Sequence, residues 1–322
     1  GRPVPWDPDK GPGRSWLDGF MARHPALSER TTHIYEANRI NENDEPRLKD
    51  FYKAWGAYVV ENKLTADRVL NTDETSSTPQ GTKAGKAFAL KGSKVPGTRR
   101  ANSRENTTIV STIGADGHTY DPTIIYKGQR MQPDWVADDN GIPGARYTVT
   151  ESSFIQSDVF LSYLRNLREQ LDARGVKGKV ALVLDGHASH TTFEAISLAI
   201  SLDIDLFQLP SHTSHMTQPL DVGTFGTFKK QMTKGLNAYP LQNGGRSPGK
   251  RDMAGVIAQA WAGSFTPSNN ISSFRGAGLW PVDMEKALGR LHSTRKRSAS
   301  DRPIPEDLAI VTSKEQLEAD LG

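Results

Sequence analysis

Three aspartates are the side chains of this sequence whose type and spacing point most directly to chemistry. Asp185 directly follows the apolar run VALVL (180–184), and Asp73 ends the apolar part of RVLNTDETS (68–76). Asp221 is separated from Asp185 by 35 residues. Carboxylates from three separate elements that converge at one edge of a sheet form an oxygen-rich site, which Mg²⁺ or Mn²⁺ prefers.

Such a site is suited to breaking phosphodiester bonds. Two divalent ions held about 3.5–4 Å apart can activate a water and stabilise the leaving oxygen. The ions must stay partly hydrated and shared with phosphate oxygens, which favours carboxylate over imidazole ligands. Each aspartate taken alone could instead cap a helix or stabilise a turn. Together, Asp73, Asp185 and Asp221 favour a metal site, with two Mg²⁺ or Mn²⁺ ions as the cofactors.

The histidines offer an alternative site. His187 and His190 follow one apolar run, and His212 and His215 follow the next, so four imidazoles could gather around zinc. The sequence contains no cysteine, and no helix is expected to place two of these histidines on one face. We therefore expect His187, His190 and His215 to support the site by orienting carboxylates or phosphate without binding metal.

Basic residues gather in two places that could contact a phosphate backbone. The loop over 81–106 carries seven Lys or Arg residues and one acid, Glu105, although a loop of this kind can also be merely solvated. Two lysines follow shortly after Asp221. The residues expected to bind DNA are Lys91, Lys94, Arg99, Arg100, Lys229 and Lys230.

The elements expected along the chain supply a frame for these residues. The sequence predicts a helix over 45–62, then a short strand within 68–76 that ends at Asp73, and a hairpin over 107–128 around Asp116-Gly117. A helix capped by Ser152 or Ser153 follows, with strands over 180–185 and 204–210. Further helices are expected over 191–202, from Asp221, over 252–263 and over 268–279. This order predicts an α/β fold whose mixed sheet is flanked by helices. In such sheets, sites lie beyond the carboxyl ends of the strands.

The composition narrows the class of protein further. The 322 residues can bury a sizeable core, and 36% hydrophobic with 24% charged residues is typical of a globular chain. The absence of cysteine excludes disulfides and thiolate metal sites, and no apolar run approaches the ~20 residues of a membrane span. We therefore expect no membrane partner, while the net charge of +3 permits a polyanionic one.

Four ordered blocks resemble the DDE-superfamily transposases, in the pogo/Tigger/jerky-like branch of the mariner superfamily. The blocks are NTDET (71–75), LVLDGHASH (182–190), LPSHTSHMTQPLDVGTFGTFKK (209–230) and SFRGAGLWPVD (273–283). The resemblance covers about residues 45–285. It implies an RNase H-like fold and a catalytic triad of Asp73, Asp185 and Asp221, whose last spacing fits that branch. Glu74 is a neighbour in the family motif and is not counted in the triad.

The resemblance also implies a function. It implies a metal-dependent DNA endonuclease and strand transferase that acts at transposon ends in the nucleus, with DNA as partner and a homodimer as a possible assembly. GRSWLDGFMARHPALS (13–28) resembles the end of the helix-turn-helix module shared with centromere protein B. We therefore expect a truncated module and linker over 1–43, a catalytic domain over 44–285 and a polar, disordered tail over 286–322. The alternatives are an inactive DNA-binding or chromosomal descendant and, less favoured, a nuclease for other polynucleotides.

Overall fold

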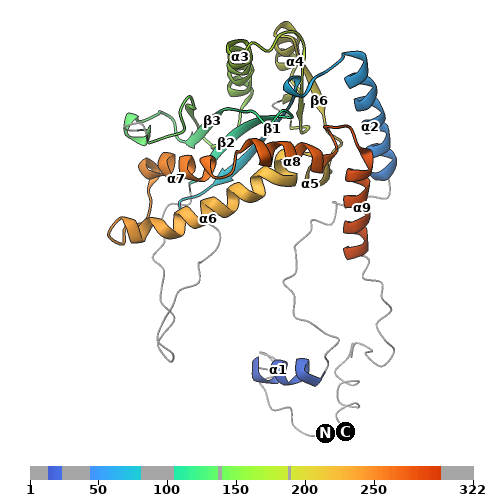
Figure 1. Ribbon diagram of the computed structural model, residues 1–322. Helices are drawn as coiled ribbons and strands as arrows, with labels where there is room; N and C mark the ends of the chain where they lie inside the picture. The colour runs from blue at the N-terminus through green and yellow to red at the C-terminus, as the bar shows by residue number, and fades with distance from the viewer. Residues whose placement is uncertain (1–13, 24–43, 81–104, 137–139, 188–189, 299–322) are drawn as a thin grey trace. The chain divides into compact units, whose positions relative to one another are not determined.

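The computed structural model describes residues 14–23, 44–80, 105–136, 140–187 and 190–298 (Figure 1). The chain divides into two compact units. One consists of residues 1–39 and 294–322, in which helix α1 (Arg14–Arg23) is described. The other, residues 40–293, contains the sheet and the three aspartates of the candidate site.

One sheet forms the centre of this second unit. Six strands within the described residues lie in the order β4-β3-β2-β1-β5-β6. They are β1 (Val69–Ser77), β2 (Thr107–Gly114), β3 (Thr119–Lys127), β4 (Arg146–Thr150), β5 (Val180–Leu184) and β6 (Ile204–Gln208). β2 pairs antiparallel with both β1 and β3, whereas β1–β5, β5–β6 and β3–β4 are parallel. The predicted mixed sheet and the hairpin at Asp116-Gly117 are confirmed, and β4 is a strand that the sequence did not predict.

Helices cover both faces of the sheet (Figure 1). One apolar core lies under α3 (Ser157–Ala173) and α4 (Phe193–Ser201). The core on the opposite face includes residues of α2 (Asp44–Glu61), α6 (Phe225–Gln242), α7 (Lys250–Ala262), α8 (Pro267–Ala277) and α9 (Met284–Ser298). Two short turns, α5 (Ser214–Thr217) and the π-helical η5 (Leu220–Thr224), connect β6 to α6.

The side chains of successive β1 residues lie on opposite faces of the sheet and therefore face different helices. Successive residues of a strand point to opposite faces. Val69 belongs to the core of α2 and α6–α9, and Leu70 belongs to the core of α3 and α4. The odd-numbered Asn71 and Asp73 therefore face the first set of helices, and the even-numbered Glu74 faces the second.

Asp73 does not end its strand, contrary to the prediction. β1 continues to Ser77 because its antiparallel pairing with β2 extends to Ser77 opposite Thr107. The parallel pairing with β5 stops earlier, at Asn71 opposite Val183. Asp73 thus lies just beyond the carboxyl end of the parallel ladder, although the strand itself runs on.

Two helix boundaries also differ from the prediction. α3 begins at Ser157 with Gln156 at its N-cap, because Ser153 adopts a left-handed backbone (φ 65°) in the preceding loop instead of capping the helix. The residues from 286 do not begin a disordered tail, because α9 extends from Met284 to Ser298. Its apolar residues at helical spacing, Ala287, Leu288 and Leu291, are buried in the core, so the fold continues past the expected boundary at 285.

Candidate active site

The first two aspartates converge because their strands are parallel neighbours. β1 and β5 pair in a register that places Asn71 opposite Val183. Continuing that register by two residues brings Asp73 opposite Asp185, on the same face of the sheet. Neighbouring strands lie about 4.8 Å apart, so the two residues lie near each other at this edge, and the charge of Asp185 contributes a small part of the raised pKa of Asp73.

The third aspartate comes from the connection between β6 and α6. Asp221 is the second residue of η5 and is exposed. Its charge reaches Asp73, whose pKa is raised well above the usual value for an aspartate. Burial is the largest cause, followed by the negative charges of Asp221 and Glu74, with a smaller effect of Asp185. A hydrogen bond from the Glu74 N–H to Asp73 Oδ1, 2.9 Å long, acts in the opposite direction.

These carboxylates suit a divalent cation. A raised carboxyl pKa among like charges means that the ionised cluster is repulsive until a positive charge enters it. The donors are all carboxylate oxygens, the ligand type that Mg²⁺ and Mn²⁺ prefer. Asp73, Asp185 and Asp221 could therefore hold a metal.

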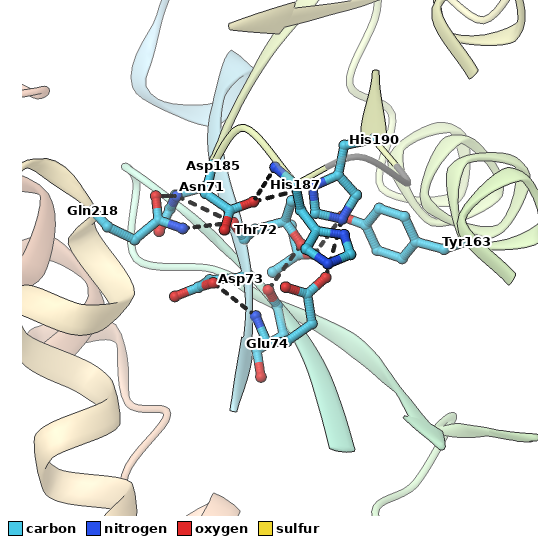
Figure 2. Close-up of polar contacts among 11 residues, drawn as sticks. Asn71, Thr72, Asp73, Glu74, Tyr163, Asp185, His187, His190 and Gln218 are labelled. Atoms are coloured by element: carbon cyan, nitrogen blue, oxygen red, sulfur yellow. Dashed lines mark hydrogen bonds and ion pairs between the residues drawn. The ribbon is translucent and has the colours of Figure 1, made fainter. Parts of the chain in front are cut away.

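The His190 ring lies between the carboxylates of Asp185 and Glu74 and contacts both (Figure 2). Its Nδ1 lies 3.2 Å from Asp185 Oδ1, and its Nε2 lies 3.1 Å from Glu74 Oε1. The ring is buried, with its centroid 4.4 Å from that of Phe160. Burial alone would lower the pKa of His190, but the contacts with the Asp185 and Glu74 carboxylates outweigh it and raise the pKa to about 9. The imidazole is therefore a cation at neutral pH.

The bridge also affects Asp185 itself. The ion pair with His190 is the main reason why the pKa of Asp185 is lowered, and burial opposes it. The backbone N–H of His187 donates a further hydrogen bond of 3.1 Å to Asp185 Oδ1. Asp185 is therefore held ionised, with one of its two oxygens oriented by the protein.

Glu74, Asp185 and His190 form a second candidate cation site. In the described part of the chain, theirs is the one group of three or more potential ligands whose ligand atoms lie within 4.8 Å of one another. A metal needs the neutral imidazole, however, and would have to displace the proton that His190 holds. The sequence prediction left Glu74 out of the site. The sequence could have identified Glu74, because it is an acidic residue next to Asp73 in a segment that carries a metal-site motif.

The other histidines do not gather into a zinc site within the described residues. The His187 ring lies 5.5 Å from that of His190, centroid to centroid. His215 lies half-buried in α5, and His212 is exposed with a left-handed backbone (φ 64°). His187 and His212 both line a hollow of about 220 Å³ beside Asp185.

The basic residues fall into two groups. Lys91, Lys94, Arg99 and Arg100 lie outside the described residues. Lys229 and Lys230 are exposed on α6 and line a groove of about 580 Å³ together with residues 76–78 at the end of β1. In this groove, Ser76 lies three residues beyond Asp73 along β1, and Gly226 lies five residues beyond Asp221 along the chain.

Comparison with known families decides the class of this site. The family model described as "DDE superfamily endonuclease" matches residues 103–274, which is more than half of the chain. The chain belongs to this family. The matched segment includes Asp185 and Asp221, and Asp73 lies N-terminal to it.

Solved structures of a DDE transposase share the fold. The Mos1 mariner paired-end complex with Mn aligns with a TM-score of 0.56 at 13% identity, over 85% of this chain and 70% of that one. The pre-cleavage Mos1 transpososome aligns with a TM-score of 0.54 at 12% identity, over 87% and 70%. The RNase H-like mixed sheet expected from the sequence is thereby confirmed.

A fungal relative is similar over part of its length. The protein named "MFS-type transporter clz9" from Cochliobolus lunatus is 28% identical over 229 residues. The match covers 69% of this chain and 25% of that protein, so the chain spans about a quarter of its relative. Among the helices that the structure describes here, none is both long and apolar enough to cross a membrane.

Proposed function

We propose that this chain is the metal-dependent endonuclease and strand-transferase core of a pogo-like DNA transposase, with Asp73, Asp185 and Asp221 as its catalytic carboxylates. The observation that carries the proposal is the position of Asp73 just beyond the parallel ladder of β1 and β5, where burial and then the charges of Asp221, Glu74 and Asp185 raise its pKa. That arrangement is costly without a cation and suited to one. Membership of the DDE endonuclease family and the fold shared with Mos1 support the same chemistry.

The three aspartates would hold two Mg²⁺ or Mn²⁺ ions, and one of the Mos1 complexes that share the fold contains Mn. Bound there, the ions would lower the pKa of a water and neutralise charge on the phosphodiester. In the reaction, a water oxygen bonds to phosphorus as the bond to the 3′ oxygen breaks, which leaves a 3′-hydroxyl. In strand transfer, the oxygen of that hydroxyl would bond to a phosphorus of the target DNA as the bond from that phosphorus to the target 3′ oxygen breaks, which leaves a 3′-hydroxyl on the target strand.

The chain's own residues orient the reactants. His190 and the His187 N–H fix one oxygen of Asp185, which leaves the second oxygen for a metal. Because His190 is charged and bonded to Glu74 as well, it stays on the side of Asp185 away from Asp73. Positioning of this kind, together with charge neutralisation, accounts for most of the rate in phosphoryl transfer.

DNA is the proposed partner. Lys229 and Lys230 line the groove beside the end of β1, where they would contact phosphates without reading sequence. The solved Mos1 structures include a strand transfer complex with a TM-score of 0.54, which supports a comparable assembly, such as a homodimer on paired ends. The spacing of 35 residues between Asp185 and Asp221 supports the pogo-like branch, and a DNA substrate supports a nuclear location.

A nicking assay on supercoiled plasmid or on transposon-end DNA tests the proposal. The chain is expected to nick DNA in Mg²⁺ or Mn²⁺ and not in EDTA, and Asp73→Asn, Asp185→Asn or Asp221→Asn should each abolish nicking while the circular dichroism spectrum stays unchanged. Nicking that survives any of these substitutions would refute the triad. Salt-dependent DNA binding without nicking by the unmodified chain would instead favour an inactive DNA-binding descendant.

A further inference from the structure

Two buried amide side chains meet where the three aspartate-bearing segments come together (Figure 2). Asn71 and Gln218 are both fully buried. Asn71 Nδ2 donates to Gln218 Oε1 at 2.8 Å and to the Val183 carbonyl at 3.0 Å. The pair therefore joins β1, the end of β5 and the segment that precedes η5.

The remaining polar atoms of the pair extend these connections. Asn71 Oδ1 accepts a hydrogen bond of 3.0 Å from the Leu220 N–H, and Gln218 Nε2 donates one of 3.0 Å to the Thr72 carbonyl. Both bonds are buried. Because an unpaired buried amide is costly, this network favours one arrangement of the segments over its alternatives.

The network anchors each segment next to its aspartate. Asn71 lies two residues before Asp73, and Val183 lies two residues before Asp185. Leu220 directly precedes Asp221, and the Val222 N–H that follows Asp221 donates 2.9 Å to the Gln218 carbonyl. A bond to the Asn71 side chain thus holds the chain before Asp221, and a bond to the main-chain carbonyl of Gln218 holds it after Asp221.

An amide is the side chain that this position requires. The Asn71 side chain donates to Gln218 and Val183 and accepts from Leu220 at the same time, and these three partners lie on segments remote from it in the sequence. A longer contact of 3.5 Å joins its Nδ2 to the neighbouring Thr72 carbonyl. A carboxylate could not donate, and an apolar side chain could do neither. The contact between Asn71 and Gln218 joins residues 147 positions apart, so it exists only when the site is assembled.

We propose that Asn71 and Gln218 are positioning residues that hold Asp73, Asp185 and Asp221 in their metal-binding arrangement. The proposal rests on the proposed function, because it concerns the same metal site. The two amides contact neither DNA nor metal in this role. They act through the backbone that carries the ligands.

The test is the Mn²⁺ dependence of thermal stability in the full chain, with DNA nicking as a second readout. For the unmodified chain, added Mn²⁺ is expected to raise the melting temperature. Asn71→Ala should increase the Mn²⁺ concentration for half of that rise by about 10- to 100-fold, the usual effect of losing a residue that supports metal ligands. Gln218→Leu should increase it by less, because Asn71 keeps its bonds to Val183 and Leu220.

Leu164→Ala is the matched control. Leu164 is fully buried in α3, in the core on the opposite face of the sheet. This variant should lower the melting temperature without changing the half-maximal Mn²⁺ concentration or the Mn²⁺ dependence of nicking. In the Asn71→Ala, Gln218→Leu double variant, the increase should not exceed that of Asn71→Ala alone, since both side chains belong to one network.

The outcomes separate this inference from the proposed function. If the unmodified chain neither melts higher in Mn²⁺ nor nicks DNA, the proposed function is wrong. If the unmodified chain does both and Asn71→Ala behaves like Leu164→Ala, the positioning role is overturned. Should Asn71→Ala not fold, Gln218→Leu decides, and an unchanged Mn²⁺ concentration for that variant would overturn the inference.

Discussion

Replacement of His190 by Gln should change how the stability of the metal-free protein depends on pH. In the folded chain, Asp185 and Glu74 raise the pKa of His190 from 6.5 to about 9. At about 1.4 kcal/mol for each tenfold change in proton affinity, this difference is worth about 3 kcal/mol in favour of the charged form. The ring is 1% exposed, so solvent screens little of this energy.

The contribution of His190 to the free energy of unfolding decreases as pH rises, because the folded chain holds the proton more tightly than the unfolded chain. Below pH 6.5 the histidine is charged in both the folded and the unfolded chain, and its contribution to stability is fully present. Between pH 6.5 and about 9 the unfolded chain has lost the proton while the folded chain keeps it, so stability falls as pH rises. Above about pH 9 the contribution of about 3 kcal/mol is gone.

Urea unfolding in EDTA at several pH values from about 6 to about 10 measures this effect. The unmodified chain should lose about 3 kcal/mol of unfolding free energy across that range through His190, and His190→Gln should lack this loss. His118→Gln is the control, because burial lowers the pKa of His118, so this histidine makes stability rise with pH and its loss cannot remove the fall that His190 causes. A His190→Gln variant that retains the full pH dependence of the unmodified chain would refute the imidazolium bridge.

Two further substitutions test the charges around the site. Asp73→Asn removes a carboxylate whose ionised form is disfavoured by burial and by neighbouring charges. Calorimetry in EDTA should therefore show the variant to be more stable by about 0.5–2 kcal/mol, and added Mn²⁺ should no longer stabilise it. A lower stability of the variant in EDTA would contradict the repulsion among the carboxylates. The double variant Lys229→Ala, Lys230→Ala should weaken binding to all duplexes alike. Measured by fluorescence anisotropy, it should reduce the slope of log affinity against log salt by about 0.9 for each phosphate that the variant no longer neutralises. An unchanged salt dependence would place the DNA elsewhere.

The sheet was predictable because its strands carry local signals. The apolar run before Asp185 and the β-branched hairpin around Asp116-Gly117 each identify a strand without reference to the rest of the chain. Parallel strands then place Asp73 and Asp185 at one edge. β4 was missed because its five residues, RYTVT, are mostly half-exposed and carry no continuous apolar run.

The support around the aspartates was not predictable in the same way. His190 and Glu74 are 116 residues apart, and Asn71 and Gln218 are 147 apart, so no local pattern links them. The end of β1 was misplaced for a related reason. Its last residues pair only with β2, and the sequence around Asp73 reads as the end of a strand because polar residues follow.

The position of Mn²⁺ in crystals of the full chain, found by anomalous scattering, tests the central claim most directly. Manganese is expected within bonding distance of Asp73, Asp185 and Asp221 oxygens, with His190 still between Asp185 and Glu74. Manganese bound by Glu74 and His190, with none at Asp73, would contradict it.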